Sequence, residues 1–427
     1  MAIIKPFKGI LYNRNIIGDL SKIVTPPYDI ITPQQQKRYY KNHPYNLIRI
    51  ILGKTTPKDC KSDNRYTRAK GFFEQWVKEK ILIADKAPSI YIYSQEYIHD
   101  GKKMKRLGFI CLAKLKEDGP KCLMPHERTF AGPKEDRFKL IKEVRANLSP
   151  IFSVFSDDDN KISRILIDYV RIHKPIVDIE VEGVKHRVWR MANKVKIKNI
   201  VRLMRDKRAL IADGHHRYEV ALKLRNAMYR ADPKHLKNYG HVMMYFATSD
   251  KKGLTILPTH RLVEGISKSD FNKKMSKLKE FFDIITVENK GKMFSLMATK
   301  GKHVFGVYLG GNSYRCLLLK QKAVRSFINA KYSTRWKSMD VVILHNLIFK
   351  RIFGLEGEAA ERAIYFTRDP RLAFLWVDEG KNRTAFLLNP PLFEDINKIA
   401  RYRERMPHKS TYFYPKPLSG LVINRLE

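Results

Sequence analysis

A short segment in the middle of the chain combines residue types that bind phosphate. Residues 209–222 begin with the apolar run Ala-Leu-Ile-Ala, continue with Asp-Gly-His-His-Arg at 213–217, and end in an apolar pattern at helical spacing. This order predicts a strand that ends in a tight turn and opens a helix. The N–H groups and the positive dipole end at the start of a helix favour a bound anion.

The polar residues of this turn each suggest a role. Asp213 is expected to cap the helix, and Gly214 lets a ligand approach the backbone closely. His215, His216 and Arg217 add side-chain donors at the same point, and an arginine suits bidentate binding of phosphate. The turn therefore predicts a cradle for a phosphate or another oxyanion, with titratable groups beside it.

Helical spacing also relates side chains along the helix that follows. Glu219 lies four residues after His215, so it can orient that imidazole and hold its tautomer. The same spacing brings Asp213 within reach of Arg217, and a purely structural ion pair would explain that relation. The gathering of polar groups at an electropositive helix end favours the functional interpretation.

A second segment of interest is the Val-Thr-Pro-Pro-Tyr-Asp sequence at 24–29. Each proline fixes φ and keeps its predecessor out of the helical region, so the segment is expected to be rigid and extended. A structural turn is the simpler interpretation. Tyr28 and Asp29 are the side chains here that we select as candidates for substrate binding.

A polar loop at 125–137 holds His, Glu, Arg, Lys and Asp close together ahead of a predicted helix. An active-site loop needs this mixture, with a carboxylate for base or metal chemistry and cations for a charged substrate. A solvated charged loop explains it equally well. We select Glu127 as a second catalytic carboxylate and His126 for substrate binding. His260 and Arg261 are further substrate-binding candidates, provided that they converge in space on the phosphate turn.

The sequence predicts neither a metal held by the protein alone nor a disulfide framework. The chain has 13 histidines, but no HxxxH or HxH spacing occurs with a carboxylate. The paired histidines of the 213–217 turn are more typical of an anion or hydrogen-bond site than of zinc. Four cysteines are scattered without CxxC spacing, which is typical of buried or incidental thiols.

Net charge raises the question of a nucleic-acid partner. The chain has 83 lysines and arginines against 43 aspartates and glutamates, a formal charge of +40. A general basic bias is the alternative, because the basic residues are spread along the chain. The densest stretch is 185–208, and no helix-turn-helix, zinc-finger or RNP-like motif stands beside it. No segment is long enough to span a membrane and the N-terminus lacks a signal-peptide profile, so we expect no membrane partner and a cytoplasmic location.

The 427 residues, 44% of them hydrophobic, suffice for two or three domains with a sizeable core. Strand and helix patterns alternate, which predicts an α/β or α+β fold. We divide the chain into a region 1–265, which contains the phosphate turn, and a mixed α/β C-terminal region 266–427. Strands are predicted at 46–52, 151–155, 186–191, 209–212 and 242–247, a hairpin at 89–115 with an Asp-Gly turn, and helices at 66–81, 133–145, 161–172, 197–204, 270–282 and 340–353.

Seven separated segments resemble a prokaryotic family catalogued as domain of unknown function ten-fifteen, nearly from end to end and in the same order. They lie at 24–31, 126–137, 147–152, 186–189, 213–218, 257–261 and 405–416. The Asp-Gly-His-His-Arg-Tyr-Glu-x-Ala run at 213–221 also resembles the signature of the superfamily that includes ParB nuclease-like domains, sulfiredoxin and archaeal free serine kinase. That resemblance implies a ParB/sulfiredoxin-like nucleotide-binding core.

In that superfamily the Gly-x-x-Arg turn at a helix start binds nucleotide phosphates. The resemblance implies that Gly214, His215 and Arg217 hold ATP, ADP or another nucleotide, with Mg²⁺ bridging. It also implies that Asp213 is a base or a metal-side carboxylate, and that His216 stabilises the transferring phosphoryl group. Sulfiredoxin carries a catalytic cysteine where this chain has His215, which argues against sulfiredoxin chemistry. No clear helix-turn-helix follows, which argues against the chromosome-partition function of ParB.

Two functions are the leading hypotheses. The first is a nucleotide-dependent, kinase-like phosphotransferase that acts on a small hydroxylated metabolite such as a hydroxy amino acid. The alternative is a nucleotide-responsive regulatory or nucleic-acid-binding protein without turnover, whose nucleic-acid affinity would fall steeply with salt. A structural scaffold with an inert anion site would show neither property.

Overall fold

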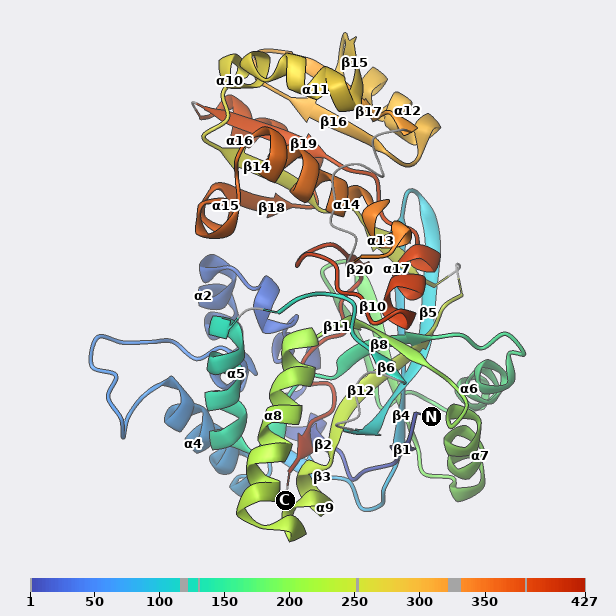
Figure 1. Ribbon diagram of the computed structural model, residues 1–427. Helices are drawn as coiled ribbons and strands as arrows, with labels where there is room; N and C mark the ends of the chain where they lie inside the picture. Colours follow the sequence, from blue (N-terminus) through green and yellow to red (C-terminus); the bar gives the residue numbers. More distant parts are fainter. Residues whose placement is uncertain are drawn as a thin grey trace. The chain divides into compact units, whose positions relative to one another are not determined.

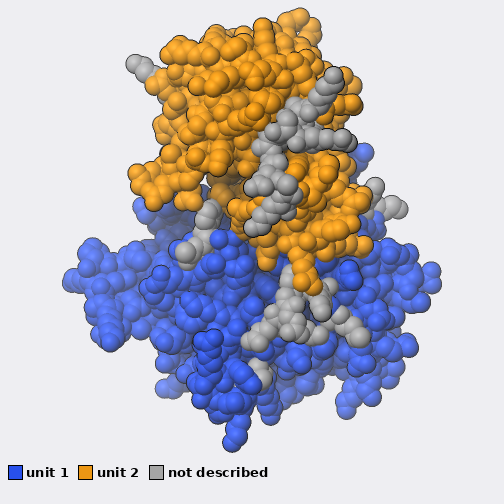
Figure 2. Space-filling view, in the orientation of Figure 1, with its two compact units in different colours: residues 1–125, 129–255, 413–427 blue, residues 126–128, 256–412 orange. Residues whose placement is uncertain are grey.

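The computed structural model describes residues 2–115, 122–129, 131–250, 253–321, 332–380 and 382–426. The chain forms two compact units, which Figure 2 shows in different colours. Unit 1 comprises Met1–Pro125, Thr129–Thr255 and Phe413–Glu427, and unit 2 comprises His126–Arg128 and Ile256–Tyr412.

These units differ from the predicted regions 1–265 and 266–427. The chain leaves unit 1 after Thr255, ahead of the predicted boundary, and the short piece His126–Arg128 belongs to unit 2. The last segment, Phe413–Glu427, returns to unit 1. Periodicity along the sequence does not reveal this return, because the segment is held by hydrogen bonds to strands that are far away in the chain.

Unit 1 is built on a mixed sheet in the order β6-β11-β8-β12-β5-β4-β10-β9, with β1 paired to β5 (Figure 1). Strand β12 runs parallel to β8 and β11 runs parallel to β6, whereas the other neighbours pair antiparallel. The predicted mixed α/β fold is therefore confirmed. The strands are β1 (Ile4–Lys5), β4 (Ile90–His99), β5 (Lys102–Lys114), β6 (Leu123–Met124), β8 (Ile151–Phe155), β9 (Val177–Val181), β10 (Val184–Met191), β11 (Ala209–Asp213) and β12 (His241–Thr248).

One face of this sheet is apolar. Because side chains alternate along a strand, β4 presents Ile92 and β5 presents Phe109 on this face. They share a buried cluster with the apolar sides of α6 (Lys161–Ile172) and α7 (Lys194–Met204). Removal of this apolar surface from water is a major favourable contribution to the folding of unit 1.

The centre of the opposite face is polar. Tyr93 and Gln95 of β4, Arg106 of β5 and His186 of β10 alternate onto it, and all four are buried. The Tyr93 hydroxyl and His186 Nδ1 form a hydrogen bond of 2.7 Å. Burial, with a smaller contribution from the charge of Arg106, lowers the pKa of His186 to about 3. The imidazole is therefore neutral in the folded protein near pH 7.

Further helices of unit 1 pack beside the sheet. Helix α5 (Ala131–Val144) lies alongside α8 (His215–Ala231) and also contacts α4 (Arg65–Lys78) (Figure 1). In the described ranges no helix combines the length and the apolarity that crossing a bilayer requires. The remaining elements are α1 (Arg14–Ile17), α2 (Pro33–Asn42), α3 (Ile48–Ile51), α9 (Leu236–Tyr239), short 3₁₀ turns at Leu20–Lys22, Tyr28–Ile30 and Pro233–His235, and the strand pairs β2 (Ile10–Tyr12) with β3 (Leu82–Ala84) and β7 (Ala146–Asn147) with β21 (Asn424–Arg425).

The strand predicted at 46–52 is wrong, because the chain forms the helix α3 there. The Asn46 side-chain oxygen accepts a hydrogen bond from the Ile48 N–H, which starts a helical turn. The apolar residues of this run are nearly all buried. A short run that is buried on every side has no periodicity that distinguishes a strand from a helix.

Unit 2 has a sheet of its own, in the order β15-β17-β16-β19-β14-β18. The predicted helix 270–282 is divided into two, and the helix predicted at 340–353 begins as α-helix and continues as π-helix. The elements are β14 (His260–Glu264), α10 (Lys268–Lys273), α11 (Met275–Phe281), β15 (Phe282–Val287), α12 (Lys290–Lys300), β16 (Val304–Tyr308), β17 (Tyr314–Leu319), α13 (Thr334–Lys337), α14 (Asp340–Ile343), the π-helix Leu344–Ile352, α15 (Gly357–Ala363), β18 (Ile364–Thr367), α16 (Pro370–Asp378), β19 (Arg383–Leu387) and α17 (Phe393–Arg401). Strands β13 (Thr255–Leu257) and β20 (Tyr412–Tyr414), where the chain passes from one unit to the other, pair as a separate two-stranded sheet.

The close approach of β5 to β12 requires a glycine at position 108. A Cβ there would overlap the Phe246 backbone oxygen and lie 2.8 Å from the Tyr245 ring. We expect Gly108→Ala to lower the free energy of unfolding by about 1–3 kcal/mol, measured by urea denaturation. Gly71 is the matched control, because it lies in α4 with open space around its Cβ position. Gly71→Ala should stabilise the protein by about 0.5–1 kcal/mol, and equal effects of the two variants would contradict the close approach.

The buried neutral His186 makes stability depend on pH. Its pKa of about 3 in the folded protein lies below the ordinary value of 6.5, so only the unfolded chain takes up a proton between these values. Stability should therefore be complete above pH 6.5 and fall as the pH is lowered toward 3. The loss at pH 5 is about 2 kcal/mol from this residue. Urea unfolding at pH 7.5 and 5.0 should show a smaller loss in His186→Gln than in the wild type.

Candidate functional site

The strand, turn and helix predicted at residues 209–222 are confirmed. Strand β11 ends at Asp213, and α8 begins at His215. Between them Gly214 is the N-cap residue, with φ at +90°. A residue with a side chain rarely adopts that backbone conformation, so this turn needs glycine.

A side chain at position 214 would also displace Arg217. The Arg217 guanidinium folds back across the turn, and a Cβ on Gly214 would lie 2.9 Å from its Nη2. Arg217 Nη1 donates to the Pro150 carbonyl at 2.7 Å, and its Nη2 donates to Asp213 Oδ2 at 2.6 Å. The glycine therefore makes room for the arginine and sets the turn at the same time.

Asp213 is shared between two cations. Besides Arg217, the Lys416 ammonium donates to Asp213 Oδ1, and both partners of this pair are buried. The expectation that Asp213 caps the helix is wrong, since no side chain caps α8 and its carboxylate is bound by these cations. Burial opposes ionisation of Asp213, but Lys416 and Arg217 outweigh it and lower the pKa of this carboxyl.

The segment predicted for substrate binding lies next to this ion cluster. Asp29 is in a 3₁₀ turn, Tyr28–Ile30, and it interacts electrostatically with Asp213, Lys416 and Arg217. Although Asp29 keeps solvent-exposed surface, the protein around its carboxyl removes water and raises its pKa. The negative charge of Asp213 raises it further. The two carboxyls are therefore pushed apart in pKa, with Asp29 the higher.

His216 and Glu219 are both partly buried on the first turns of α8. Burial lowers the pKa of His216, and Asp29 and Glu219 counteract this only in part, so the imidazole is neutral near pH 7. Glu219 Oε2 accepts from Thr129 Oγ1 at 2.6 Å and from Lys134 Nζ at 3.2 Å. The bond from Lys134 joins the start of α8 to α5, a contact that helical spacing alone does not indicate.

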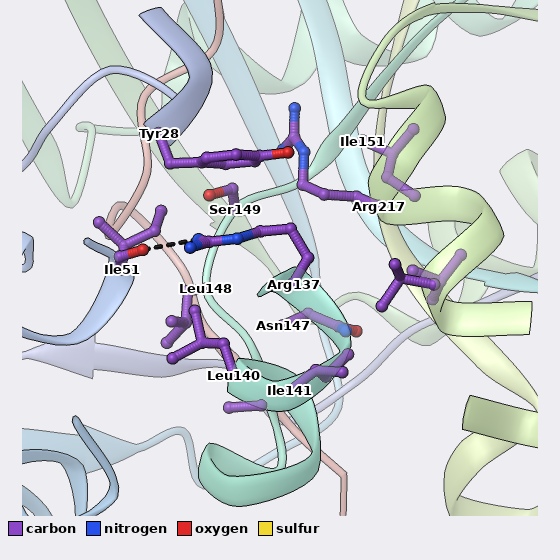
Figure 3. Close-up of a pocket in the computed structure, with 13 residues that line it drawn as sticks. Tyr28, Ile51, Arg137, Leu140, Ile141, Asn147, Leu148, Ser149, Ile151 and Arg217 are labelled. Carbon is purple, nitrogen blue, oxygen red and sulfur yellow. Dashed lines mark hydrogen bonds between the residues drawn. The ribbon is translucent and has the colours of Figure 1, made fainter. Parts of the chain in front are cut away.

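A small cavity of about 60 Å³ lies beside the turn, and Arg217 and Tyr28 both line it (Figure 3). The Tyr28 ring stacks on the Arg137 guanidinium, with 4.0 Å between the ring centre and Arg137 Cζ. Arg137 Nη1 donates to the Ile51 carbonyl at 2.6 Å. Ser149 also lines the cavity. The remaining lining side chains, apart from Asn147, are apolar, so the space is small and mainly apolar.

Four of the predicted site residues belong to unit 2, and two of them share one partner there. His126 Nε2 and Thr411 Oγ1 are 2.9 Å apart. Glu127 Oε1 accepts from the Thr411 N–H and from its hydroxyl, both at 2.8 Å. The structure thus brings His126 and Glu127 together at Thr411, the residue before β20, while Asp213 and its partners belong to unit 1.

His260 and Arg261 are buried in the interior of unit 2. His260 Nδ1 accepts from the Leu388 N–H at 3.2 Å, and burial lowers the pKa of this imidazole to about 4. Arg261 donates to His345 Nε2 at 3.3 Å and to the Lys409 carbonyl at 3.1 Å. Burial lowers the pKa of Arg261 to about 9, although the nearby Glu127 charge opposes it.

The described residues contain no group of three or more His, Cys, Asp or Glu side chains able to hold a metal ion. Mg²⁺ that arrives with a nucleotide needs only one or two carboxylates, because phosphates and waters supply its other ligands. Asp213 and Asp29 are two carboxyls close enough that the charge of Asp213 raises the pKa of Asp29. This donor set fits a nucleotide-bound Mg²⁺ and does not fit a metal held by protein side chains alone.

Sequence reasoning did not select Lys416 or Arg137. Lys416 contacts Asp213 across 203 positions of the chain, and no local pattern reports a contact at that separation. The available signal was its place in the 405–416 segment, which takes part in the family resemblance without offering a recognisable chemical motif. Arg137 lies in α5, within the 125–137 segment where the mixture of charges indicated Glu127 instead.

The chain belongs to the family described as "Protein of unknown function (DUF1015)", which it matches over residues 4–342. This confirms the family predicted from the sequence segments. No curated protein matches the chain.

Solved structures show a distant likeness. A variant of free serine kinase in complex with AMP has 12% identity and a TM-score of 0.37, over 71% of this chain and 87% of that chain. A conserved hypothetical protein from Pyrococcus furiosus has 14% identity and a TM-score of 0.36, over 74% and 95%. SbnI from Staphylococcus aureus, with a C-terminal truncation, has 10% identity and a TM-score of 0.36, over 73% and 85%. Similarity at this level carries no argument about activity.

Two glycines with nearly equal φ test the role of the turn. Gly214 (φ +90°) and Gly265 (φ +89°) both lie where a side chain is strained, but only Gly214 faces Arg217. Each Gly→Ala change should lower the free energy of unfolding by about 1–2 kcal/mol, because it strains the backbone. Gly214→Ala should cost at least about 1 kcal/mol more, because Arg217 is moved away from Asp213. Equal losses in urea denaturation would show that Arg217 does not depend on the glycine.

Proposed function

We propose that this protein is a nucleotide-dependent phosphotransferase whose phosphate site is the turn at residues 213–217. The acceptor would be a small hydroxylated metabolite, such as a hydroxy amino acid. Gly214, His215 and Arg217 would bind the nucleotide phosphates. The acceptor would lie close to Asp29 and the cavity beside Tyr28.

One observation carries this proposal. Asp213 is buried between Arg217 and Lys416, at a glycine turn that opens the 17-residue helix α8. Two cations that converge at the positive end of a helix form a strong site for phosphate. Arg217 also forms part of the cavity wall, so one guanidinium adjoins both the phosphate site and a space for a second ligand.

Phosphate binding would change the partners of Asp213. The cations that now neutralise this carboxylate are the groups that phosphate oxygens would attract. When Arg217 and Lys416 turn toward phosphate, Asp213 becomes available to a nucleotide-bound Mg²⁺. Bound Mg²⁺ would supply neutralisation of phosphate charge, with Asp213 as its protein carboxylate.

In the transfer step, the acceptor hydroxyl oxygen forms a bond to the terminal phosphorus of the nucleotide. The bond between that phosphorus and the bridging oxygen breaks, and the nucleotide leaves with the electron pair. The hydroxyl proton passes to a carboxylate. Asp29 suits this role better than Asp213, because its raised pKa makes it the stronger base. His216, neutral near pH 7, would donate a hydrogen bond to the transferring group.

The catalytic role of Glu127 and the substrate-binding roles of His126, His260 and Arg261 stay predictions. All four belong to unit 2, and the proposal for the 213–217 turn does not require them.

The nucleic-acid alternative also stays a prediction, and the basic stretch 185–208 gives it limited support. Arg187 pairs with Glu96 at 2.9 Å, and Arg190 pairs with Asp85 at 2.5 Å. Lys207 lies 3.9 Å from Asp157. Such pairing reduces the positive field that a nucleic-acid backbone would meet.

A thermal-shift experiment tests the nucleotide site. ATP, ADP, CTP and GTP with Mg²⁺ are added to the wild type, to Arg217→Ala and to Arg230→Ala. A nucleotide that binds only the folded protein raises its melting temperature in proportion to ln(1 + [L]/Kd). Arg217→Ala should bind at least about tenfold more weakly, because it loses a charge-assisted contact. Arg230→Ala, an equal charge change on an exposed residue at the far end of α8, should bind like the wild type.

Turnover then separates an enzyme from a binding protein. With a nucleotide that binds, formation of the nucleotide product should rise when a hydroxylated acceptor is added. Asp29→Asn should lower kcat by about 10²–10⁴-fold, the range for loss of a general base. No shift with any nucleotide, or binding without turnover with any acceptor, would overturn the phosphotransferase proposal.

A further inference from the structure

The C-terminal segment of unit 1 supplies one of the two cations at Asp213. Residues 413–427 return to this unit only after the chain has passed through unit 2. Lys416 is 9% exposed, and its ammonium is directed at Asp213. Lysine is rarely buried to this extent without a partner, so the position of its backbone must be well determined.

Side chains from the polar face of the sheet hold that backbone. Arg106 Nη1 donates to the Tyr414 carbonyl at 3.2 Å, and its Nη2 donates to the Pro415 carbonyl. Gln95 Nε2 donates to the Lys416 carbonyl at 3.1 Å. Three successive carbonyls are thus fixed by donors from two neighbouring strands.

The two donors also hold each other. Gln95 and Arg106 are directly paired across β4 and β5, and Gln95 Oε1 accepts from Arg106 Nε at 3.1 Å. The guanidinium lies 4.5 Å from the centre of the Phe152 ring. Both side chains are almost completely buried, at 0% and 1% exposure. Burial of a guanidinium is costly, and here charge-assisted bonds to backbone carbonyls offset that cost.

The segment is fixed again just beyond Lys416. The Leu418 N–H donates to the Tyr93 hydroxyl at 3.3 Å, and Ser419 exchanges backbone hydrogen bonds with Thr25. The same stretch also bonds Ser149, which lines the cavity, through the Ser419 hydroxyl at 2.7 Å. Hydrogen bonds therefore fix the backbone on both sides of Lys416, and one of them reaches a residue that lines the cavity.

We propose that Lys416 is a phosphate-binding residue of the 213–217 site, and that Gln95 and Arg106 are positioning residues that act through it. The inference rests on the proposed function for the phosphate site, but it concerns an anion and does not depend on which nucleotide carries it. Unit 1 therefore lacks a complete site until the C-terminal segment has returned to it.

Pyrophosphate binding, measured by isothermal titration calorimetry on the full chain, tests the role of Lys416. Lys416→Met should weaken binding by about tenfold or more, the effect of losing a charged hydrogen-bond donor. Lys105→Met is the matched control, because this exposed lysine precedes Arg106 on β5 and carries the same charge. The control should bind pyrophosphate like the wild type. Unchanged affinity in Lys416→Met would overturn the assignment.

Gln95→Glu tests the positioning role while keeping the shape of the side chain. The new carboxylate still accepts from Arg106, but it cannot donate to the Lys416 carbonyl. Pyrophosphate affinity should fall by about three- to tenfold. Amides of residues 414–419 should exchange their hydrogens faster than in the wild type. Gln95→Met serves as the second variant if the introduced charge prevents folding.

A double-variant cycle separates positioning from general stability. If Gln95 acts through Lys416, then adding Gln95→Glu to Lys416→Met should cost no further affinity for pyrophosphate. Additive losses would overturn the positioning role. Pyrophosphate binding that needs Lys416, without binding of any nucleotide, would support this inference and refute the nucleotide proposal. Nucleotide binding that is unaffected by Lys416→Met would support the nucleotide proposal and refute the role of Lys416. A wild type that binds neither pyrophosphate nor a nucleotide would refute both proposals.

Discussion

The shared carboxylate of Asp213 is the interaction on which the site depends. Arg217 reaches it from the first turn of α8, and Lys416 reaches it from the C-terminal segment. A buried carboxylate with one cation would be an ordinary ion pair, whereas two cations leave the group with more positive than negative charge. Asp29 lies within electrostatic reach of these three groups, and its burial together with the charge of Asp213 raises its pKa. An incoming anion therefore meets partners that are already gathered and desolvated.

The sheet of unit 1 explains how such a cluster is held. Its apolar face packs on α6 and α7 and supplies stability. Its other face places Tyr93, Gln95 and Arg106 where the C-terminal segment crosses. A polar group in a protein interior must find a partner, and here the partners are backbone carbonyls and an N–H of an irregular segment. The hydrogen bonds that satisfy these buried side chains of the sheet also fix the backbone that carries Lys416.

Local features of both the fold and the site could be predicted from the sequence. The turn at Gly214 follows from an apolar run, a glycine and a helical pattern within a dozen residues, and the structure has that arrangement. The i, i+4 relation likewise gave the pair Asp213 and Arg217. The role expected for Asp213 as a helix cap was wrong, because a capping preference is overruled when stronger charged partners arrive from elsewhere. Propensity is a local quantity, and Lys416 is not a local partner.

Contacts between residues far apart in the chain are indicated less clearly by the sequence. Strands β4, β5 and β10 carry the polar residues Gln95, Arg106 and His186 at buried positions on one face of the sheet. Regular strands already bond their own backbone groups, so these side chains need partners outside the ladder. A segment without regular structure that crosses the sheet is the natural source of free carbonyls. Polar residues at inward positions of neighbouring strands therefore indicate that a distant segment crosses there, although they do not identify it.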